Sequence, residues 1–483
     1  MGDHLRRGVD MKETSTVHTD LSFLGPGRKW PPTEDQARLA RYAKNRLLME
    51  GDHDLVFTGL NEDDAPRIIK MRVNWFKRIM TLFADLAVGN PPAIRADDQA
   101  TADRIVEENS LHLTVYDLFT DIIAYGDGVL KVRWNGGRGV ISRIDPRLWF
   151  PVVDPDDVGT FTAHVLAWEV PFGDDKYVKV EIHKPGKIEH RLLQLTADGK
   201  EIKGPVPLST ISRYASLKPE EETGVDAFLV APFSNLKSGD GVYGLDDFKG
   251  ISDLVEEIER RLIKVSRTLD VFSDPWMCGP SGLRVRDPLT GEVVWASDEK
   301  YIALNEGESP PEILVWDAQM GATFTQIETL LSQLYVMAEL SPAAFGEVKT
   351  GLAESGSALK RLMLPTLAKV NRLRLRIRPK LIEVLKTTAE LEVASRMSGA
   401  QKLVNVSLEW RSALPVDPVE AVKVEAMRRG ARATSTRGSL SRLDPDATEK
   451  DLEAEEARIK EEEAMSSLPD LPDLSQKGQT FKY

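Results

Sequence analysis

The hydrophobic period of this chain changes twice along its length, and these changes limit the fold more than any other feature. Up to about residue 124, apolar residues recur every three or four positions, as in amphipathic helices. After the turn Tyr125-Gly-Asp-Gly128 the period becomes about two, which predicts strands, and from Leu245 onward it is helical again. The chain is therefore predicted to be an α+β protein, with an antiparallel sheet appended to helices.

Three helices are predicted before the sheet. The first covers 33–50, where Thr33 and Gln36 have the spacing of a capping box. The second covers 68–88 and stops at Gly89-Asn-Pro-Pro92, and the third covers 102–124. The second helix places these apolar residues on one face: Ile69, Val73, Phe76, Ile79 or Met80, Phe83, and Leu86 or Ala87.

The sheet is predicted from short alternating segments separated by turn residues. Segments 129–134 and 140–144 flank Asn135-Gly-Gly137, which tolerates positive φ and favours a tight hairpin. Further strands are predicted at 163–170, 177–183 and 190–195. Consecutive strands joined by such short turns pair in the antiparallel direction.

Two long apolar stripes at helical spacing follow the sheet. The first stripe holds Phe248, Ile251, Leu254, Ile258, Leu262, Val265 and Leu269, and the second holds Phe324, Ile327, Leu330 or Leu331, Leu334, Met337 and Leu340. Between them, 274–319 contains a predicted hairpin at 283–295 and strand-like pieces at 301–304 and 313–316. Two helices of about 22 residues, each about 33 Å long, would form a stalk that holds this module away from the body. Two core helices of one compact domain are the alternative.

Length and composition exclude several classes of protein. The chain has 483 residues, so it should divide into about three packed units. No stretch approaches the length of apolar sequence that a membrane span needs, and the start lacks the apolar region of a signal peptide. The product is expected to stay in the compartment where it is made. The single cysteine, Cys278, permits no internal disulfide and is interpreted as a small core residue.

Positive charge is concentrated in one segment of an otherwise acidic chain. The formal net charge is -13, but 360–380 contains eight Lys or Arg and no acid. This segment follows a break at Ser341-Pro342 and a small polar stretch that contains Gly346, Gly351 and Gly356. Pro365 and Pro379 are predicted to kink or break the basic helix, because proline removes a backbone donor.

The pattern Ser-Gly-x-Ala-x-Lys at 355–360, followed by a proline-interrupted basic helix, resembles the tunnel-loop region of tailed-bacteriophage portal proteins. Other segments resemble the wing of siphophage portals, and a last strand and charged helix resemble the return to the wing and the crown. Their shared order extends the resemblance over about 35–463. The matching segments are Leu86-Ala-Val-Gly-Asn-Pro-Pro92, Tyr125-Gly-Asp-Gly-Val-Leu-Lys-Val-Arg-Trp134, Ile144-Asp-Pro-Arg-Leu-Trp-Phe-Pro151, Val404-Asn-Val-Ser-Leu-Glu-Trp410 and Leu414-Pro-Val-Asp-Pro418.

The resemblance implies a portal fold that assembles as a ring. In that fold the wing, stem and crown are mostly helical, antiparallel β elements lie in the wing, and the clip is a small α/β unit. The implied division is a flexible arm 1–29, wing 30–243, first stem helix 244–273, clip 274–319, second stem helix 320–340, tunnel loop 341–357, kinked basic helix and return to the wing 358–412, crown 413–465 and disordered tail 466–483.

The resemblance also implies a function. Portal proteins form a dodecameric ring at one capsid vertex, through which double-stranded DNA is packaged and ejected. The implied partners are further copies of the chain, non-specific DNA, the terminase large subunit, a head-completion adaptor, and the major capsid and scaffolding proteins. The expected location is the virion, after assembly in the host bacterial cytoplasm. No membrane partner and no cofactor are implied.

On this resemblance the tunnel loop projects into the channel. Lys349 is the candidate for phosphate contact, Glu347 and Glu354 moderate the local field, and Gly346, Gly351 and Gly356 allow the loop to change shape. A loop that contacts only solvent is the alternative. The basic residues proposed to line the channel or to pair with acids of a neighbouring subunit are Lys360, Arg361, Arg372, Arg374 and Arg376.

Two other function classes remain open from the sequence. One is a different oligomeric virion connector or minor capsid protein, and the other is a DNA-processing enzyme that uses carboxylates and a metal. The enzyme class has little support, because Gly351 to Gly356 lacks the Lys-Ser or Lys-Thr of a phosphate-binding loop. The seven histidines show no metalloprotease spacing. The nearby acids Asp127, Asp145, Asp154, Asp156 and Asp157 fit turn chemistry, so no metal is predicted.

Overall fold

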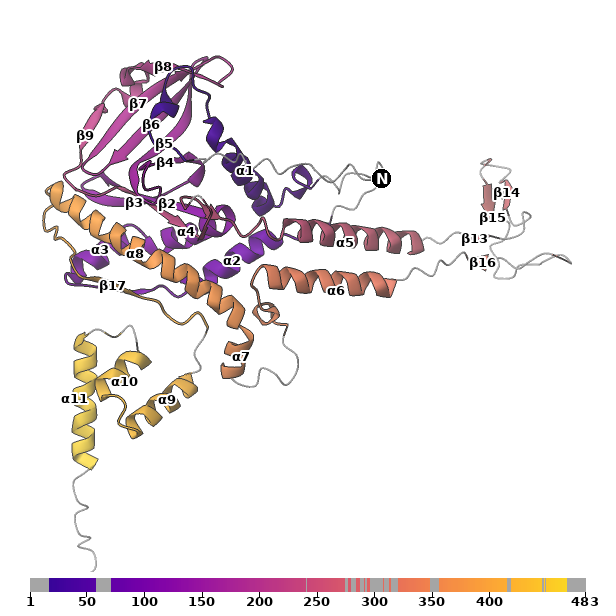
Figure 1. The fold of residues 1–483 in the computed structure, drawn as a ribbon. Helices are drawn as coiled ribbons and strands as arrows, with labels where there is room; N and C mark the ends of the chain where they lie inside the picture. The colour runs from indigo at the N-terminus through magenta and orange to yellow at the C-terminus, as the bar shows by residue number, and fades with distance from the viewer. Residues whose placement is uncertain are drawn as a thin grey trace, which may run out of the picture.

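The computed structural model describes residues 17–57, 71–239, 241–273, 277–278, 284–286, 291, 293–295, 307, 312–313, 320–347, 356–414, 418–444, 447 and 449–466. These residues form a mixed body of helices and sheets, a pair of helices that extends away from the body, and three helices that follow it in sequence (Figure 1). None of the described helices is both long and apolar enough to cross a membrane.

Four helices precede the main sheet: α1 Gln36–Glu50, α2 Trp75–Val88, α3 Gln99–Glu108 and α4 Leu111–Tyr125. The predicted apolar face of α2 is buried at Phe76, Ile79, Met80, Phe83 and Ala87. However, α2 begins at Trp75, where the side chain of Asn74 accepts a hydrogen bond from the backbone N–H of Lys77. Val73 therefore precedes the helix, and Ile69 lies outside the described residues.

Two further details of the predicted helices were wrong. The helix predicted over 102–124 is two helices, because Ser110 adopts a left-handed conformation with φ of 44° between α3 and α4. The predicted capping box is not formed, since α1 begins at Gln36 without a side-chain cap. The nearby Asp35 is instead buried, where it hydrogen-bonds to His18 and Arg38.

The main sheet has six antiparallel strands, ordered β4-β5-β6-β7-β8, with β9 pairing with β7. One face, which carries Val178, Val180 and Ile182 of β6 and Phe150 of β4, packs on Phe23 and Trp30. The other face of β6 is buried as well, although it carries Lys179, Glu181 and His183. The strands are β4 Trp149–Val153, β5 Phe161–Phe172, β6 Asp175–Lys184, β7 Lys187–Leu195, β8 Ile202–Val206 and β9 Glu220–Glu222.

Smaller sheets connect distant parts of the chain. The predicted hairpin is confirmed, because Asn135 pairs with Arg138 across Gly136 and Gly137, whose φ values are 63° and 86°. The strands outside the main sheet are β1 Ala93–Ala96 with β17 Val406–Glu409, β10 Val230–Ser234 with β2 Asp127–Asn135 and β3 Arg138–Ile144, and β11 Leu236–Lys237 with β12 Gly244–Leu245. Short 3-10 helices lie at Ser22–Leu24, Thr33–Asp35, His53–Leu55, Pro146–Leu148, Leu208–Thr210, Ser212–Tyr214 and Pro342–Phe345.

The two predicted long helices are α5 Ser252–Ser273 and α6 Met320–Met337, which lie side by side and extend from the body (Figure 1). α5 begins seven residues later than the predicted Leu245. The predicted stripe is buried near the body at Ile258 and Leu334, whereas Leu269 and Phe324 are half exposed. The apolar face of the pair is therefore only partly covered within one chain.

Between α5 and α6 the described residues are short strands. β14 Arg284–Arg286 pairs with β15 Val293–Trp295, as the predicted hairpin requires, and β13 Met277–Cys278 pairs with β16 Glu312–Ile313. The strand predicted at 301–304 lies outside the described residues.

The C-terminal part is helical. Its helices are α7 Gly356–Leu362, α8 Leu364–Ala394, α9 Pro418–Gly430, α10 Thr436–Leu443 and α11 Glu449–Ser466. Glu425 of α9 accepts hydrogen bonds from Arg428 and from Arg442 of α10, which joins these two helices. Gly430 is the last helical residue of α9, and Arg432 beyond it has a positive φ. The predicted disordered tail, 466–483, lies outside the described residues after Ser466.

Candidate functional site

The segment predicted to be a tunnel loop is only partly described. Lys349, Gly351 and Glu354 lie in 348–355, outside the described residues, so their roles stay predictions. Gly346 ends a 3-10 turn with φ of 81°, a conformation that favours glycine. Gly356 is the first residue of α7. The loop thus leaves the body at a glycine and returns at the start of a helix.

The residues before the loop are anchored in the body. The backbone N–H of Ser341 donates to Oγ1 of Thr366 in α8 over 2.8 Å. The side chain of Glu347 accepts a hydrogen bond of 3.1 Å from the hydroxyl of Tyr335 in α6. Burial, together with this carboxylate, raises the pKa of Tyr335 to about 12. Tyr335 also packs on Phe345 and Trp75. One end of the loop is therefore held by both α6 and α8.

The basic segment forms two helices. As predicted, it breaks near Pro365, at Met363 between α7 and α8, but α8 continues as a helix through Pro379. Val370, Leu373, Ile377 and Leu381 form its buried stripe. The cations therefore point in several directions, and their surroundings differ strongly.

Arg374 is buried and binds inside its own chain. Its guanidinium donates to the carbonyl oxygens of Ala87 at 2.9 Å, Leu86 at 3.0 Å and Arg411 at 2.9 Å. Leu86 and Ala87 belong to the last turn of α2, where carbonyl oxygens lack helical partners and the helix dipole favours a cation. Burial lowers the pKa of Arg374. These contacts account for Arg374 within one subunit.

Lys369 was not singled out from the sequence, yet it is also buried. Its Nζ lies 2.9 Å from Oδ2 of Asp247 and 4.2 Å from the ring centre of Phe83. Both Lys369 and Arg374 lie at helical spacing from the apolar stripe: Lys369 precedes Leu373 by four residues, and Arg374 follows Val370 by four. That spacing was the available signal that these two cations belong to the core.

The other predicted cations lie nearer the surface. Arg372 forms an ion pair of 2.6 Å with Glu339, which follows α6. Lys360, Arg361 and Arg376 are exposed, and none of them forms an ion pair with another described residue. The role predicted for these three cations therefore stays a prediction.

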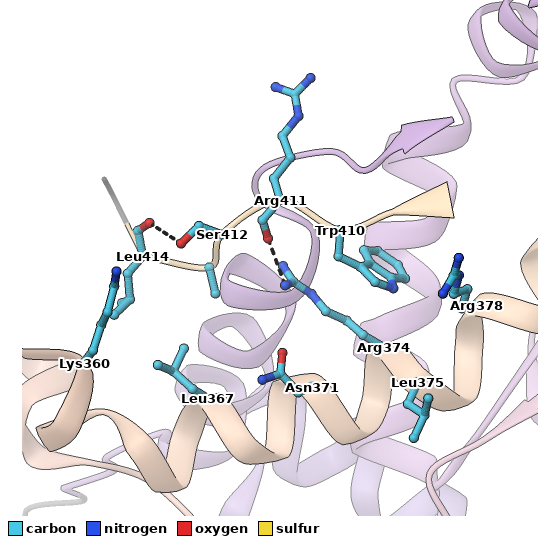
Figure 2. Close-up of a pocket in the computed structure, with 11 residues that line it drawn as sticks. Lys360, Leu367, Asn371, Arg374, Leu375, Arg378, Trp410, Arg411, Ser412 and Leu414 are labelled. Carbon is cyan, nitrogen blue, oxygen red and sulfur yellow. Dashed lines mark hydrogen bonds between the residues drawn. The ribbon is translucent and has the colours of Figure 1, made fainter. Parts of the chain in front are cut away.

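Arg374 also forms part of a groove between α8 and the segment after β17 (Figure 2). The groove has a volume of about 430 Å³ and is open to solvent. It is lined by Lys360, Leu367, Asn371, Arg374, Leu375, Arg378, Trp410, Arg411, Ser412, Ala413 and Leu414. No lining residue is acidic.

The acids considered for a metal have other partners. Asp127 is buried and accepts hydrogen bonds from the Tyr42 hydroxyl and the Gly244 N–H. Asp145 caps a 3-10 helix and pairs with Arg147. Among the described residues, no three His, Cys, Asp or Glu side chains are arranged to hold a metal ion.

The comparisons with known proteins concern almost the whole chain. The family model described as phage portal protein, SPP1 Gp6-like, matches residues 29–467. No curated protein sequence matches the chain significantly. One similar solved structure is the neck of an empty GTA particle, with 14% identity, a TM-score of 0.46, and coverage of 87% of this chain and 96% of that chain. Another is the virion of a native gene transfer agent particle, with 14% identity, a TM-score of 0.43, and coverage of 86% and 96%.

Proposed function

The chain belongs to the SPP1 Gp6-like family of phage portal proteins, and from this premise we propose that its copies form the ring-shaped channel for double-stranded DNA at one capsid vertex. The observation that carries the proposal is the family match over 29–467. The family is structural and not enzymatic, so the chain is a portal connector and a virion component.

We propose a dodecameric ring divided as the sequence suggested, with 30–243 as the wing, 244–273 and 320–340 as the stem, 274–319 as the clip and 413–465 as the crown. Two features support this division. α5 and α6 extend together from the body and hold paired strands between them (Figure 1). Their apolar faces are half exposed at Leu269 and Phe324, as expected for helices that neighbouring subunits cover.

DNA is proposed to pass the loop between α6 and α7. A channel that conducts DNA must hold it without gripping it, since each phosphate neutralised by a fixed cation adds sequence-independent affinity. One lysine per subunit, Lys349, on a loop that also carries Glu347 and Glu354, would give weak contacts repeated around the ring. Because Glu347 already accepts from Tyr335, it would moderate the field from a fixed position.

The exposed cations of α7 and α8 are proposed to contact a neighbouring subunit or DNA. Lys360, Arg361 and Arg376 fit this role, because they are exposed and meet no acid among the described residues. Arg372 and Arg374 are less suited, since Glu339 and backbone carbonyls already bind them.

Further partners follow from the proposed place in the particle. The terminase large subunit would dock at the clip during packaging, and the head-completion adaptor would replace it afterwards. The major capsid and scaffolding proteins would contact the wing during head assembly in the host cytoplasm.

Electron microscopy of the purified full-length chain tests the proposal. We expect end-on views with twelvefold or similar rotational symmetry. They should also show an axial channel wide enough for a DNA duplex, which is roughly 20 Å in diameter. A monomer at several salt concentrations and in the presence of scaffold and capsid proteins, or a closed particle without a channel, would contradict it.

A further inference from the structure

The groove between α8 and the segment 410–414 has a chemistry that neither the ring nor the DNA channel explains. Its cationic side chains are Lys360, Arg374 and Arg378, and the guanidinium of Arg411 points away from it (Figure 2). Beside these cations lie the apolar side chains of Leu367, Leu375, Leu414 and Trp410. A surface that combines cations with apolar side chains, one of them the exposed Leu375, is expected to bind an occupant that is both acidic and apolar.

The floor of the groove is one stripe of α8. Leu367, Asn371, Arg374 and Arg378 follow one another at spacings of four, three and four residues, which places them on one side of the helix. At a rise of about 1.5 Å per residue the stripe is roughly 17 Å long. Next to it, Leu375 is 74% exposed. The groove is thus elongated and has an uncovered apolar side chain near its centre.

Among the described residues, no acid neutralises the positive charge of the groove. The described hydrogen bonds of Arg374 go to carbonyl oxygens, which carry no formal charge. Lys360 and Arg378 form no ion pair with another described residue. Carboxylates of an incoming segment would therefore form charge-assisted hydrogen bonds there without displacing an existing partner.

One segment of the chain outside the described residues has the complementary chemistry. Residues 468–474 read Leu468-Pro-Asp-Leu-Pro-Asp-Leu474, with leucine at every third position and two aspartates between. Proline fixes φ and biases the residue before it toward extended conformations. In polyproline II geometry, with three residues per turn and about 3.1 Å per residue, the leucines would share one face and the segment would span roughly 19 Å. This length matches the stripe of α8.

Pro469 and Pro472 lie three residues apart. Proline-rich segments with this spacing bind grooves lined by aromatic residues, because ordering their extended conformation costs little entropy. The groove contains Trp410. In Figure 1 the C-terminal end of α11, where this segment begins, points away from α8. A second copy can therefore present the segment more readily than the same chain can.

We propose that residues 468–474 of one copy bind in the groove between α8 and 410–414 of a second copy. The leucines pack against Leu367, Leu375 and Leu414, and the aspartates bind Lys360 and Arg378. The inference rests on the proposed homo-oligomer. DNA is the competing occupant for the cations, but a phosphate backbone offers nothing to cover Leu375.

Site-specific photo-crosslinking in the full-length chain tests the docking. Leu471 is replaced by a photoreactive benzoylphenylalanine, and isotopically heavy and light copies are mixed before assembly. We expect crosslinks between heavy and light copies that map to 367–378 or 410–414. The same photoreactive residue at Gln479, in the same tail but beyond the repeat, is the matched control and should not mark the groove.

Charge variants then test the chemistry. Asp470→Asn with Asp473→Asn, or Arg378→Glu in the receiving copy, should lower the crosslink yield roughly tenfold, since a charge-assisted hydrogen bond contributes about a factor of ten to an association constant. Glu461→Gln with Glu462→Gln removes the same charge from exposed positions of α11 and should leave the yield unchanged.

The outcomes separate the inference from the proposed function. If rings form without crosslinks to the groove, the docking is overturned and the portal proposal stands. The same holds if crosslinks join only segments of the same isotope, because these crosslinks lie within one copy. A groove crosslink that duplex DNA abolishes, together with stronger DNA binding by the Asp470→Asn, Asp473→Asn variant, would identify the groove as a DNA site and also overturn it. Failure to form any oligomer would refute both proposals.

Discussion

Charged side chains have different surroundings on the buried face of β6 and on the surface of α7 and α8. In the sheet, Glu181 pairs with Lys131 and His183, and Lys179 contacts His190. On α7 and α8, Lys360, Arg361 and Arg376 are exposed and have no acidic partner among the described residues. The carboxylate of Glu181 thus has cationic partners within one chain, and Lys179, which has no described ion pair, is held in the fold by His190 and a backbone carbonyl. The cations of α7 and α8 that lack a described partner are expected to contribute little to the fold, and we propose that they serve association.

Two arginines of α8 offer the sharpest test of this contrast. Arg374→Met leaves the carbonyl oxygens of Leu86, Ala87 and Arg411 without their donor. We expect it to lower the free energy of unfolding by about 4 kcal/mol, because each buried group left unsatisfied costs about 1–3 kcal/mol. Arg376→Met, the matched control two residues away, should change it by less than about 0.5 kcal/mol.

Urea denaturation of the two variants, followed by circular dichroism, gives both values. Equal losses of stability would mean that Arg376 also has a structural partner within the chain, and the contrast between matched and unmatched cations would fail.

Asp127 tests the contrast inside the body, because its partners are polar but uncharged. Burial raises the pKa of Asp127 to about 7, although Tyr42 and Gly244 donate hydrogen bonds to it. For Glu181, burial also acts to raise the pKa, but His183 and Lys131 outweigh it and keep the pKa below its ordinary value. Glu181 thus stays ionised, whereas Asp127 takes up a proton near neutral pH.

The sign of the resulting pH dependence follows from linkage. The folded state binds the proton of Asp127 more tightly than the unfolded state, so its contribution to stability is largest at acid pH. This contribution is lost as the pH rises from the ordinary value of about 4 to about 7. Asp127→Asn should remove about 2–3 kcal/mol of this decline in the free energy of unfolding. The measurement compares the free energy of unfolding as a function of pH for the variant and for the native chain. Parallel profiles of variant and native chain from pH 4 to 7 would contradict the assignment, and Glu220→Gln, at an exposed site, is the control.

Charge reversal of the unmatched cations should act on assembly and hardly at all on folding. We expect Arg376→Glu to change the free energy of unfolding by less than about 0.5 kcal/mol. Ring formation, measured by analytical ultracentrifugation, should fall, and the native rings should weaken with added salt. Normal rings from Arg376→Glu would show that this cation does not contact a neighbour.

The smallest effect is expected at the loop lysine. Lys349→Ala should leave folding and ring formation unchanged and reduce only DNA retention. The logarithm of DNA affinity should fall less steeply with the logarithm of salt concentration, with a slope smaller by about 0.9 for each phosphate that the lysine no longer neutralises. An unchanged slope for Lys349→Ala would indicate that Lys349 contacts only solvent and not DNA.

The sequence predicted those parts of the fold whose signals are local. The hairpin at 135–137 followed from residues that adopt positive φ, and the strands 163–170, 177–183 and 190–195 followed from alternation. The break at Ser110 was missed, because the apolar period continues across it and neither Gly nor Pro marks it. The capping box failed because Thr33 lies inside a 3-10 helix that precedes α1, and the side chain of Gln36 donates to the carbonyl oxygen of Pro31.

The candidate site was less predictable, because neighbours far along the chain decide whether a cation is buried. The basic segment was identified and Arg374 was proposed to line the channel or to pair with a neighbouring subunit, whereas the structure shows that Arg374 binds the end of α2 and that Lys369, which was not singled out, binds Asp247. Counting charges along the sequence identifies neither the end of α2 nor Asp247 as a partner of these cations. The roles of Lys349, Gly351 and Glu354 stay predictions.

The pairing of β1 with β17 has a consequence for how the chain folds as it is synthesised. Ala96 pairs with Val406, so about 310 residues separate the partners. At roughly 5–20 residues per second, the ribosome needs about 15–60 s to make that interval. During this time β1 presents an unpaired edge to other nascent chains, which is a hazard for aggregation. β1 can pair only after β17 has left the ribosome, so a chain stalled before β17 lacks this two-stranded sheet.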